Sequence, residues 1–305
     1  MGPDFVPIEN LAQPRLPPWL RHSHSHHESV QTLKRHLRGR RLHTVCESAR
    51  CPNIHECFHR GTATFMILGN LCTRGCGFCA VPKSRPGARA LPPDAGEPSS
   101  VARMAAAMRL NYVVITSVNR DDLPDGGSSH FAETIIQVRR ALPRARIEVL
   151  TPDFCGCLED VRRVLDASPD VFNHNMETVE RLYKRVRPQA VYGRSLEVLA
   201  EAKRYRPDIL TKSGLMVGLG ETPAEVEHLL ADLRAASVDV VTIGQYLQPT
   251  RRNLKVSEYV PPEQFDAYRA VGLRLGFRAV FSGPLVRSSY MAEEVSAVAA
   301  WEPRE

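Results

Sequence analysis

Three cysteines within eight residues constrain this chain more than any other feature. Cys72, Cys76 and Cys79 follow one another with the spacing C-x3-C-x2-C. The run 64–68 just before them is short and apolar, so it predicts a buried strand, and the cysteines are expected on the loop that leaves this strand. Three thiolates on a four-iron, four-sulfur cluster leave one iron open to a small molecule, as catalytic metal sites do.

A second set of three cysteines precedes the first. Cys46, Cys51 and Cys57 have gaps that do not repeat at helical spacing, and Pro52 disfavours a helix at Cys51, so these thiols are expected on an irregular loop. The two sets could pool into one zinc site, but zinc sites usually use matched cysteine pairs about 12–20 residues apart. The unlike spacings favour two separate clusters.

Composition restricts the class of protein. The chain has 305 residues, 43% of them hydrophobic and 24% charged, which is ordinary for a globular protein, and no apolar run has membrane-spanning length. Eight cysteines and an N-terminal stretch without an apolar core predict a reducing compartment and metal ligation. The formal charge is +6. Basic residues gather near the N-terminus, where they form either a solvated face or a docking face for an acidic partner: Lys34, Arg35, Arg38, Arg40, Arg41, Arg50 and Arg60.

After the second cysteine set, strand and helix patterns alternate. Strands are predicted at 64–68, 112–116, 147–150, 171–172, 215–217, 240–243 and 277–281. Helices are predicted at 99–109, 131–142, 158–165, 196–205, 222–236 and 261–276, and a further short basic helix is predicted at 30–42, before both cysteine sets. Repeated strand–helix units imply a parallel sheet with right-handed crossovers, and six or seven units suit an α/β barrel or a partial barrel. Its site is expected at the carboxyl ends of the strands.

The segments that follow these strands are polar or rich in glycine. The loop 117–127 clusters carboxylates and glycines, which suits either a ligand-facing loop or a structural turn. The segment 173–178 offers amides, an imidazole and a carboxylate, which can recognise hydroxyls and amines. The segment 214–222 carries glycines that let backbone approach a ligand closely. The segment 244–249 follows the next strand.

These motifs resemble those of a known family. C-x3-C-x2-C with Phe78 before the last cysteine resembles the radical SAM signature. The set C-x4-C-x5-C, the run 172–175, the run 211–215, the run 244–249 and Arg-Ser-Ser-Tyr at 287–290 together resemble the lipoyl synthase family over about residues 30–292. The chain departs from the family pattern at Asn70, Asn119, Asn253 and Phe281.

The resemblance implies a partial (βα)6-type TIM barrel of the radical SAM kind with extensions at both ends. It divides the chain into an N-terminal extension with the auxiliary-cluster cysteines (1–60), the barrel (61–283) and a C-terminal segment with the Arg-Ser-Ser-Tyr motif (284–305). It implies two 4Fe–4S clusters, one on Cys72, Cys76 and Cys79 that binds and cleaves S-adenosylmethionine, and one that is consumed as the sulfur source. The implied ligands of the second cluster are Cys46, Cys51, Cys57 and Ser289.

The resemblance also implies which residues meet S-adenosylmethionine. They come from the cysteine loop and from the segments after four strands: Phe78, Ser117, Asn119, Asn175, Glu177, Gly218, Glu221, Tyr246 and Leu247.

The implied reaction inserts two sulfur atoms at C6 and C8 of an octanoyl chain on a lysine of a lipoyl carrier domain or H protein. An unactivated C–H bond offers no acid–base handle, so a radical cofactor must do the hard step. An external donor such as flavodoxin or ferredoxin would supply electrons. We expect a monomeric, cytoplasmic enzyme with no nucleic-acid or membrane partner.

Other interpretations of the cysteines stay open at this point. Another radical SAM sulfur-inserting enzyme, similar to biotin synthase or a methylthiotransferase, would use the same first cluster. A ferredoxin-like electron carrier would use four cysteines per cluster and need no barrel. A zinc protein that binds nucleic acid would hold zinc in place of iron.

Three residues have a structural alternative. Ser289 is either a cluster ligand or the N-cap of a helix, because the residues after it resemble a capping sequence. Cys155 and Cys157 have C-x-C spacing that could indicate a third metal site. We interpret them as ordinary small residues near the start of a helix.

Overall fold

The computed structural model describes residues 16–20, 42–44, 64–84 and 91–289. Cys46, Cys51 and Cys57 and most of the predicted helix at 30–42 lie outside the described residues. No helix in the described ranges is both long enough and apolar enough to cross a membrane.

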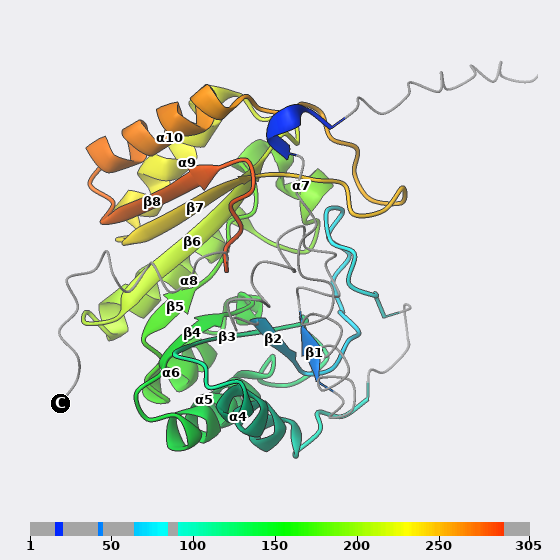
Figure 1. Cartoon of the computed structure of the whole chain (residues 1–305), viewed down its shortest axis with the longest axis vertical. Coiled ribbons are helices and arrows are strands. Elements are labelled where there is room, and N and C mark those ends of the chain that lie inside the picture. Colours follow the sequence, from blue (N-terminus) through cyan, green and yellow to red (C-terminus); the bar gives the residue numbers. More distant parts are fainter. Residues whose placement is uncertain (1–15, 21–41, 45–63, 85–90, 290–305) are drawn as a thin grey trace, which may run out of the picture.

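A single eight-stranded sheet forms the frame of the described chain, in the spatial order β1 to β8 (Figure 1). The two-residue strand β1 is antiparallel to β2, and all later neighbours are parallel. The strands are β1 (His43–Thr44), β2 (Thr64–Ile67), β3 (Tyr112–Ser117), β4 (Arg146–Leu150), β5 (Val171–Asn173), β6 (Leu210–Val217), β7 (Val240–Gln245) and β8 (Ala279–Gly283).

A helix follows each of the parallel strands β2 to β7 and returns the chain to the start of the next strand. These helices are α4 (Glu97–Ala107), α5 (Ser128–Ala141), α6 (Leu158–Asp166), α8 (Tyr192–Tyr205), α9 (Pro223–Ala235) and α10 (Pro262–Arg274). Shorter helices are η1 (Pro18–Leu20), η2 (Phe154–Gly156), η3 (Glu180–Leu182) and α7 (Tyr183–Val186). The helices line the outer, convex side of the curved sheet (Figure 1). Six strand–helix units and a final strand confirm the predicted partial barrel.

Apolar side chains fill the space between the sheet and its helices. Ile115 and Val149 point outward from their strands and join Phe131 of α5 in one buried cluster. Ile243 and Leu230 belong to a second cluster around β6 to β8. Because neighbouring residues of a strand face opposite sides, the residues between these apolar ones point into the barrel.

Inside the barrel, the strands β3 to β6 enclose a buried ion pair and its hydrogen-bond partners. The ammonium of Lys212 lies 3.0 Å from both carboxylate oxygens of Glu148, and neither side chain is exposed. Tyr112 donates to the same carboxylate at 2.7 Å, and the Asn173 amide donates at 2.9 Å. Every oxygen of Glu148 therefore has two donors, which is the condition under which a buried ion pair is tolerated.

This group explains why β6 was predicted too short. The strand begins at Leu210, five residues before the predicted start. The polar run Thr211-Lys212-Ser213 reads as a loop, yet it is buried. Asp239 accepts from the Thr211 backbone at 3.0 Å, and Ser213 donates to the His174 carbonyl at 2.9 Å.

Other differences concern elements with weak periodic signals. The strand β1 and the short helices η2, η3 and α7 were not predicted, and α8 begins at Tyr192, four residues earlier than predicted. The parallel strands run from Thr64 to Gly283, within the predicted barrel domain 61–283. The division of the chain into three domains remains a prediction.

Candidate active site

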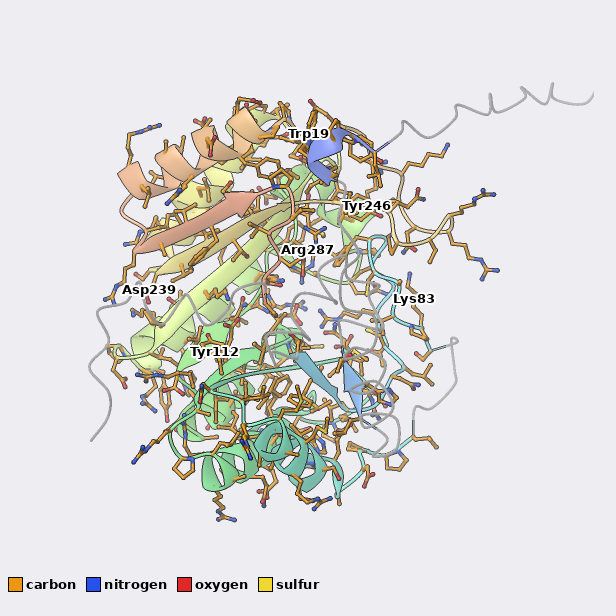
Figure 2. All side chains as sticks on the ribbon, viewed as in Figure 1. Trp19, Lys83, Tyr112, Asp239, Tyr246 and Arg287 are labelled. Carbon is orange, nitrogen blue, oxygen red and sulfur yellow. The ribbon has the colours of Figure 1, made fainter. Side chains whose placement is uncertain are left out.

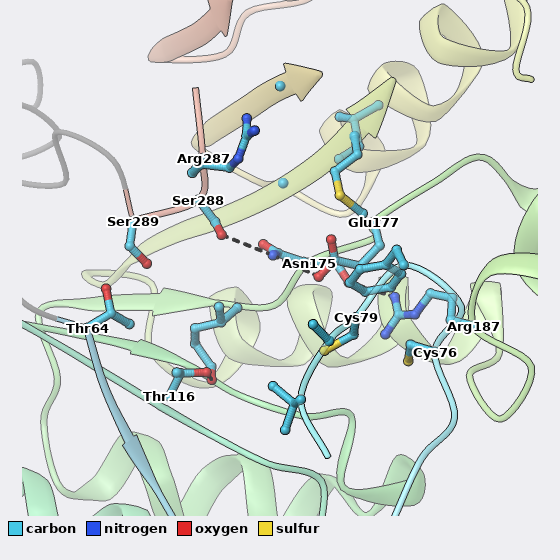
Figure 3. Close-up of a pocket in the computed structure, with 18 of the residues that line it drawn as sticks. Thr64, Cys76, Cys79, Thr116, Asn175, Glu177, Arg187, Arg287, Ser288 and Ser289 are labelled. Carbon is cyan, nitrogen blue, oxygen red and sulfur yellow. Dashed lines mark hydrogen bonds between the residues drawn. The ribbon is translucent and has the colours of Figure 1, made fainter. Parts of the chain in front are cut away.

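A cavity of about 490 Å³ opens at the carboxyl ends of the parallel strands (Figure 3). Its walls come from the loops after β2, β3, β5 and β7, together with the segment after β8. This is the edge of the barrel at which the sequence predicts a site. Its volume is typical of a pocket for a small-molecule ligand.

The cysteine loop after β2 is held by hydrogen bonds from three other loops. The Thr73 backbone donates to the Asn119 carbonyl at 3.0 Å, and the Gly77 backbone donates to the Val186 carbonyl at 2.8 Å. The Asn253 amide donates to the carbonyls of Gly77 at 3.1 Å and Cys79 at 2.9 Å. Cys72, Cys76 and Cys79 all line the cavity.

Arg74 anchors the same loop from behind. Its guanidinium is 3% exposed and donates to Asp121 at 2.7 and 2.9 Å and to Asp153 at 2.5 Å. Burial would raise the pKa of Asp153, but the hydrogen bond and charge of Arg74 outweigh burial and lower this pKa to about 2. Asp121 therefore has a structural role, whereas Ser117 and Asn119 of the same β3 loop line the cavity.

The three thiols of the cysteine loop are partly buried. Burial, with a smaller contribution from the charges of the neighbouring cysteines, raises the pKa of Cys76 to about 12 and that of Cys79 to about 11. Without a metal such thiols stay protonated at neutral pH, and iron must displace the protons to bind. Three partly buried thiols on one loop that lines a cavity fit an iron–sulfur cluster better than they fit free cysteines, although their side chains are not gathered in this structure as the ligands of a bound cluster would be.

Several polar atoms in the cavity have no hydrogen-bond partner in the described structure. They are Oγ of Ser117, Oδ1 of Asn119 and Oδ1 of Asn175. Buried polar groups are almost always paired in folded proteins, so atoms left unpaired in a cavity indicate a ligand that pairs them. A nucleoside or an amino acid offers the required donors and acceptors.

The other predicted contact residues divide into two groups. Phe78, Glu177, Tyr246 and Leu247 line the cavity together with Asn175. The Asn175 amide donates to Glu177 at 3.0 Å, and burial raises the pKa of this carboxyl.

Gly218 and Glu221 are not among the residues that line the cavity. Glu221 accepts from the backbones of Gly218 and Leu219, and the turn that it closes lies behind Gln245, which does line the cavity. A direct contact of these two residues with a cofactor stays a prediction.

The C-terminal segment 284–289 crosses the cavity rim and brings Ser289 into its wall. The Gln245 backbone donates to the Pro284 carbonyl at 3.3 Å, and the Asn175 amide donates to the Ser288 hydroxyl at 3.3 Å. Gly244 permits this approach, because a Cβ there would lie 2.1 Å from the Val286 carbonyl oxygen. Ser289 lies across the cavity from Cys76 and Cys79 (Figure 3).

Sequence analysis missed Arg187, which lines the cavity from the connection between α7 and α8. Its guanidinium donates to the carbonyls of Asn175 at 2.7 Å and Met176 at 3.0 Å, and its charge lowers the pKa of Cys76 against the effect of burial. No local pattern marks this residue, since its position depends on a four-residue helix without periodicity.

Cys155 and Cys157 lie in η2 and at the N-cap of α6, near a helix start as predicted, but both are exposed. The Cys155 thiol lies 3.4 Å from Asp121 and 3.6 Å from Arg74. In the part of the chain that the structure describes, no group of three or more His, Cys, Asp or Glu side chains lies close enough together to hold a metal ion, either beside these two cysteines or at the loop 72–79.

A partial barrel with three cysteines on the loop after its first parallel strand defines a radical SAM enzyme, and comparison with known proteins agrees. The model of the radical SAM superfamily matches residues 66–233, and a model of the N-terminal domain of lipoyl synthase matches residues 4–51. The chain is 54% identical to lipoyl synthase of Thiobacillus denitrificans over 97% of this chain and 94% of that protein. It is 55% identical to lipoyl synthase of Rubrobacter xylanophilus over 91% and 85%, respectively. The chain therefore belongs to the lipoyl synthase family.

A solved structure supports the fold. The FeFe-hydrogenase maturase HydG from Carboxydothermus hydrogenoformans superposes with a TM-score of 0.55 and 13% identity, covering 90% of this chain and 83% of that chain. Membership of the radical SAM superfamily implies a 4Fe–4S cluster and S-adenosylmethionine as cofactors, and membership of the lipoyl synthase family implies an auxiliary cluster.

Proposed function

We propose that this enzyme inserts two sulfur atoms at C6 and C8 of an octanoyl chain that is bound to a lysine of a lipoyl carrier domain or H protein. The observation that carries the proposal is the meeting of the two motifs in one cavity. Three cysteines of the β2 loop and Ser289 of the C-terminal segment line the same walls, although more than 200 residues separate them. An electron carrier has no use for such a substrate-sized cavity.

Cys72, Cys76 and Cys79 would hold the first cluster. When bound, this cluster supplies the electron that cleaves S-adenosylmethionine to a 5′-deoxyadenosyl radical, and the second cluster supplies sulfide. The loop residues determine where the cleaved molecule lies. Phe78 would lie against the adenine, Ser117 and Asn119 would pair with the methionine end, and Asn175 and Glu177 would pair with the ribose.

The remaining wall residues would complete this site. Tyr246 and Leu247 would flank the nucleoside, and Gly218 and Glu221 would shape the wall from behind Gln245. The tyrosine hydroxyl donates to the Leu254 carbonyl at 2.8 Å, which orients its ring. A radical needs a site without water or stray quenchers, and a buried tyrosine and a half-buried leucine would help to provide one.

Cys46, Cys51, Cys57 and Ser289 would hold the second cluster. A serine oxygen is a harder ligand than a thiolate and matches a soft iron–sulfur centre less well. The Ser289 bond would therefore break readily when the cluster gives up sulfide.

Two variants test the serine. Ser289→Ala should forfeit product, and Ser289→Cys should retain a cluster that releases sulfur poorly. Iron content after anaerobic purification and product yield are the measurements. Full product yield from Ser289→Ala would show that this serine is only a helix cap.

The substrate would reach the cavity as a long chain on a lysine, presented by a carrier domain. The basic residues near the N-terminus suit an acidic carrier surface. Eight cysteines and the need for reduced clusters suit a cytoplasmic, monomeric enzyme that receives electrons from a flavodoxin or ferredoxin.

The direct test is mass analysis of an octanoyl-lysine peptide after incubation with the reconstituted enzyme, S-adenosylmethionine and dithionite. The product should gain two sulfur atoms, and it should lose two hydrogens once its dithiol has been oxidised to the disulfide. Cys51→Ala should still cleave S-adenosylmethionine but insert no sulfur, which separates the two clusters. A methylthio or single-sulfur product would instead indicate another sulfur-inserting radical SAM enzyme.

A further inference from the structure

Exposed cations surround the outside of the cysteine loop. They come from the end of the loop segment itself, from α7 and from the segment between β7 and α10, and none forms an ion pair with another described residue. We call this set the cationic collar: Lys83, Lys184, Arg185, Arg251, Arg252 and Lys255.

The collar is attached directly to the cysteine loop. The Lys83 ammonium donates to the Cys76 carbonyl at 3.1 Å. Val186, next to Arg185, accepts from the Gly77 backbone at 2.8 Å, and Leu254, next to Lys255, donates to the Gly77 carbonyl at 3.0 Å. Figure 1 shows α7, the loop segment and the segment after β7 together at one edge of the molecule, and Figure 2 shows the Lys83 side chain at that edge.

The charge of this edge is almost entirely positive. The segments 69–84, 183–190 and 246–261 contain a single carboxylate residue, Glu258. Two further carboxylates beside the cysteine loop, those of Asp121 and Asp153, are ion-paired with the buried Arg74 and do not offset the collar. A compact patch of one sign attracts a partner of the opposite sign and speeds its association.

We infer that the cationic collar is the docking surface for a small acidic protein that carries one electron, such as a flavodoxin. The inference rests on the proposed function, since it needs a cluster on Cys72, Cys76 and Cys79. In the docked complex an anionic flavin hydroquinone would lose one electron to become the neutral semiquinone, and the oxidised cluster would gain that electron.

Distance favours an electron donor over the octanoyl carrier at this surface. Electron transfer becomes steeply slower with distance, so a donor protein must dock where the cluster loop meets the surface. The collar residues lie within one or two residues of the backbone that bonds this loop. An acyl chain on a lysine can reach a buried site from a more distant docking face.

The experiment reverses the charge of three collar residues that have no other described contact through their side chains. The variant is Arg251→Glu/Arg252→Glu/Lys255→Glu. The matched control reverses three exposed cations on the outer helices α5 and α10, Arg140→Glu/Arg269→Glu/Arg274→Glu, so both proteins have the same net charge. Binding of oxidised flavodoxin to each holoenzyme is measured by titration at low and high salt, without turnover.

The collar variant should bind flavodoxin at least about tenfold more weakly than wild type at low salt, and the difference should shrink at high salt. Cleavage of S-adenosylmethionine with reduced flavodoxin should slow by a similar factor, whereas cleavage with dithionite should stay unchanged. The control variant should behave as wild type in every assay.

Equal weakening in both variants would mean that net charge alone matters and would overturn the inference. Unchanged flavodoxin binding by the collar variant would do the same. If the variant instead lost activity only on an octanoylated carrier domain with dithionite as reductant, the collar would belong to the carrier. A wild-type enzyme that cleaves no S-adenosylmethionine with either reductant would contradict the proposed function and leave flavodoxin binding as a separate result.

Discussion

Buried polar groups are paired differently in two parts of the barrel interior. One part lies within the strands, around Glu148, and the other lies at the carboxyl ends of the strands, where the cavity opens. Within the strands, Lys212, Tyr112 and Asn173 donate to both oxygens of Glu148, so this charge is satisfied within the protein, although Oδ1 of Asn173 itself has no described partner. In the cavity, Ser117, Asn119 and Asn175 each have a side-chain oxygen with no described partner. Satisfied polar groups stabilise a fold, whereas unsatisfied ones in a cavity await a ligand. An unpartnered oxygen therefore points to a ligand only where its residue also lines the cavity, as Ser117, Asn119 and Asn175 do.

The largest effect on activity is expected from a change in the cysteine loop at the cavity. Cys76→Ala should abolish cleavage of S-adenosylmethionine, because two thiolates do not hold the cluster that supplies the electron. The matched control is Cys155→Ala, which removes an exposed thiol outside the cavity. Iron content and 5′-deoxyadenosine are the measurements. Loss of cleavage in both variants would show that cysteine removal acts on the fold rather than on the site.

A large effect on stability is expected when the ion pair of Lys212 and Glu148 is broken. Lys212→Met leaves the Glu148 carboxylate buried and uncompensated, which should lower the free energy of unfolding by about 3–5 kcal/mol. Lys212→Met/Glu148→Gln should recover most of this loss, because the glutamine is neutral and still accepts a hydrogen bond. Urea unfolding of the cluster-free proteins measures both values. A double variant less stable than Lys212→Met would contradict the ion-pair explanation.

A smaller effect is expected where the C-terminal segment covers the cavity. Gly244→Ala would push a methyl group against the Val286 carbonyl, which should cost about 1–3 kcal/mol and displace Ser289. Gly193→Ala is the control, since no atom lies within 4 Å of its added Cβ, and it should be neutral or stabilising by up to about 1 kcal/mol. Thermal unfolding and lipoyl product yield test the pair. Equal behaviour of the two variants would mean that the segment does not depend on Gly244.

The smallest effect is expected at two adjacent residues, Thr116 and Ser117, of which only the first has a described side-chain hydrogen bond. Thr116 donates to the Leu150 carbonyl at 2.8 Å, so Thr116→Val should lower stability by about 1 kcal/mol. Ser117→Ala removes a hydroxyl with no described partner and should change stability by less than about 0.5 kcal/mol. It should nevertheless weaken binding of S-adenosylmethionine to the reconstituted enzyme. Equilibrium dialysis and urea unfolding separate the two effects, and a stability loss without weaker binding would make Ser117 a structural residue.

Much of this molecule could be predicted from local patterns. The apolar runs at 112–116 and 240–243 and the capped start at Thr222 are strong signals, and the structure has β3, β7 and α9 there. The capping box of Thr222 and Glu225 is present in full. The cysteine spacing located the loop because three thiols at close intervals have few other uses.

The features that were not predicted from the sequence depend on contacts between residues that are distant in sequence, or on short irregular segments. Lys212 lies in a strand only because Glu148, 64 residues earlier, neutralises it. Arg187 reaches the cavity through a short helix that has no periodicity. The exposure of Cys155 follows from a turn in which Phe154, Cys155 and Gly156 all have positive φ, and no pattern of residue types announces such a turn.

We expect that a radical made beside the cysteine loop removes hydrogen from an octanoyl chain in the cavity. The most direct measurement uses an octanoyl-lysine peptide that is fully deuterated along the chain, with mass analysis of the 5′-deoxyadenosine produced. We predict that each molecule of 5′-deoxyadenosine linked to product carries one deuterium, and that two form for each chain that gains two sulfur atoms. Product formation with 5′-deoxyadenosine free of deuterium would contradict the account.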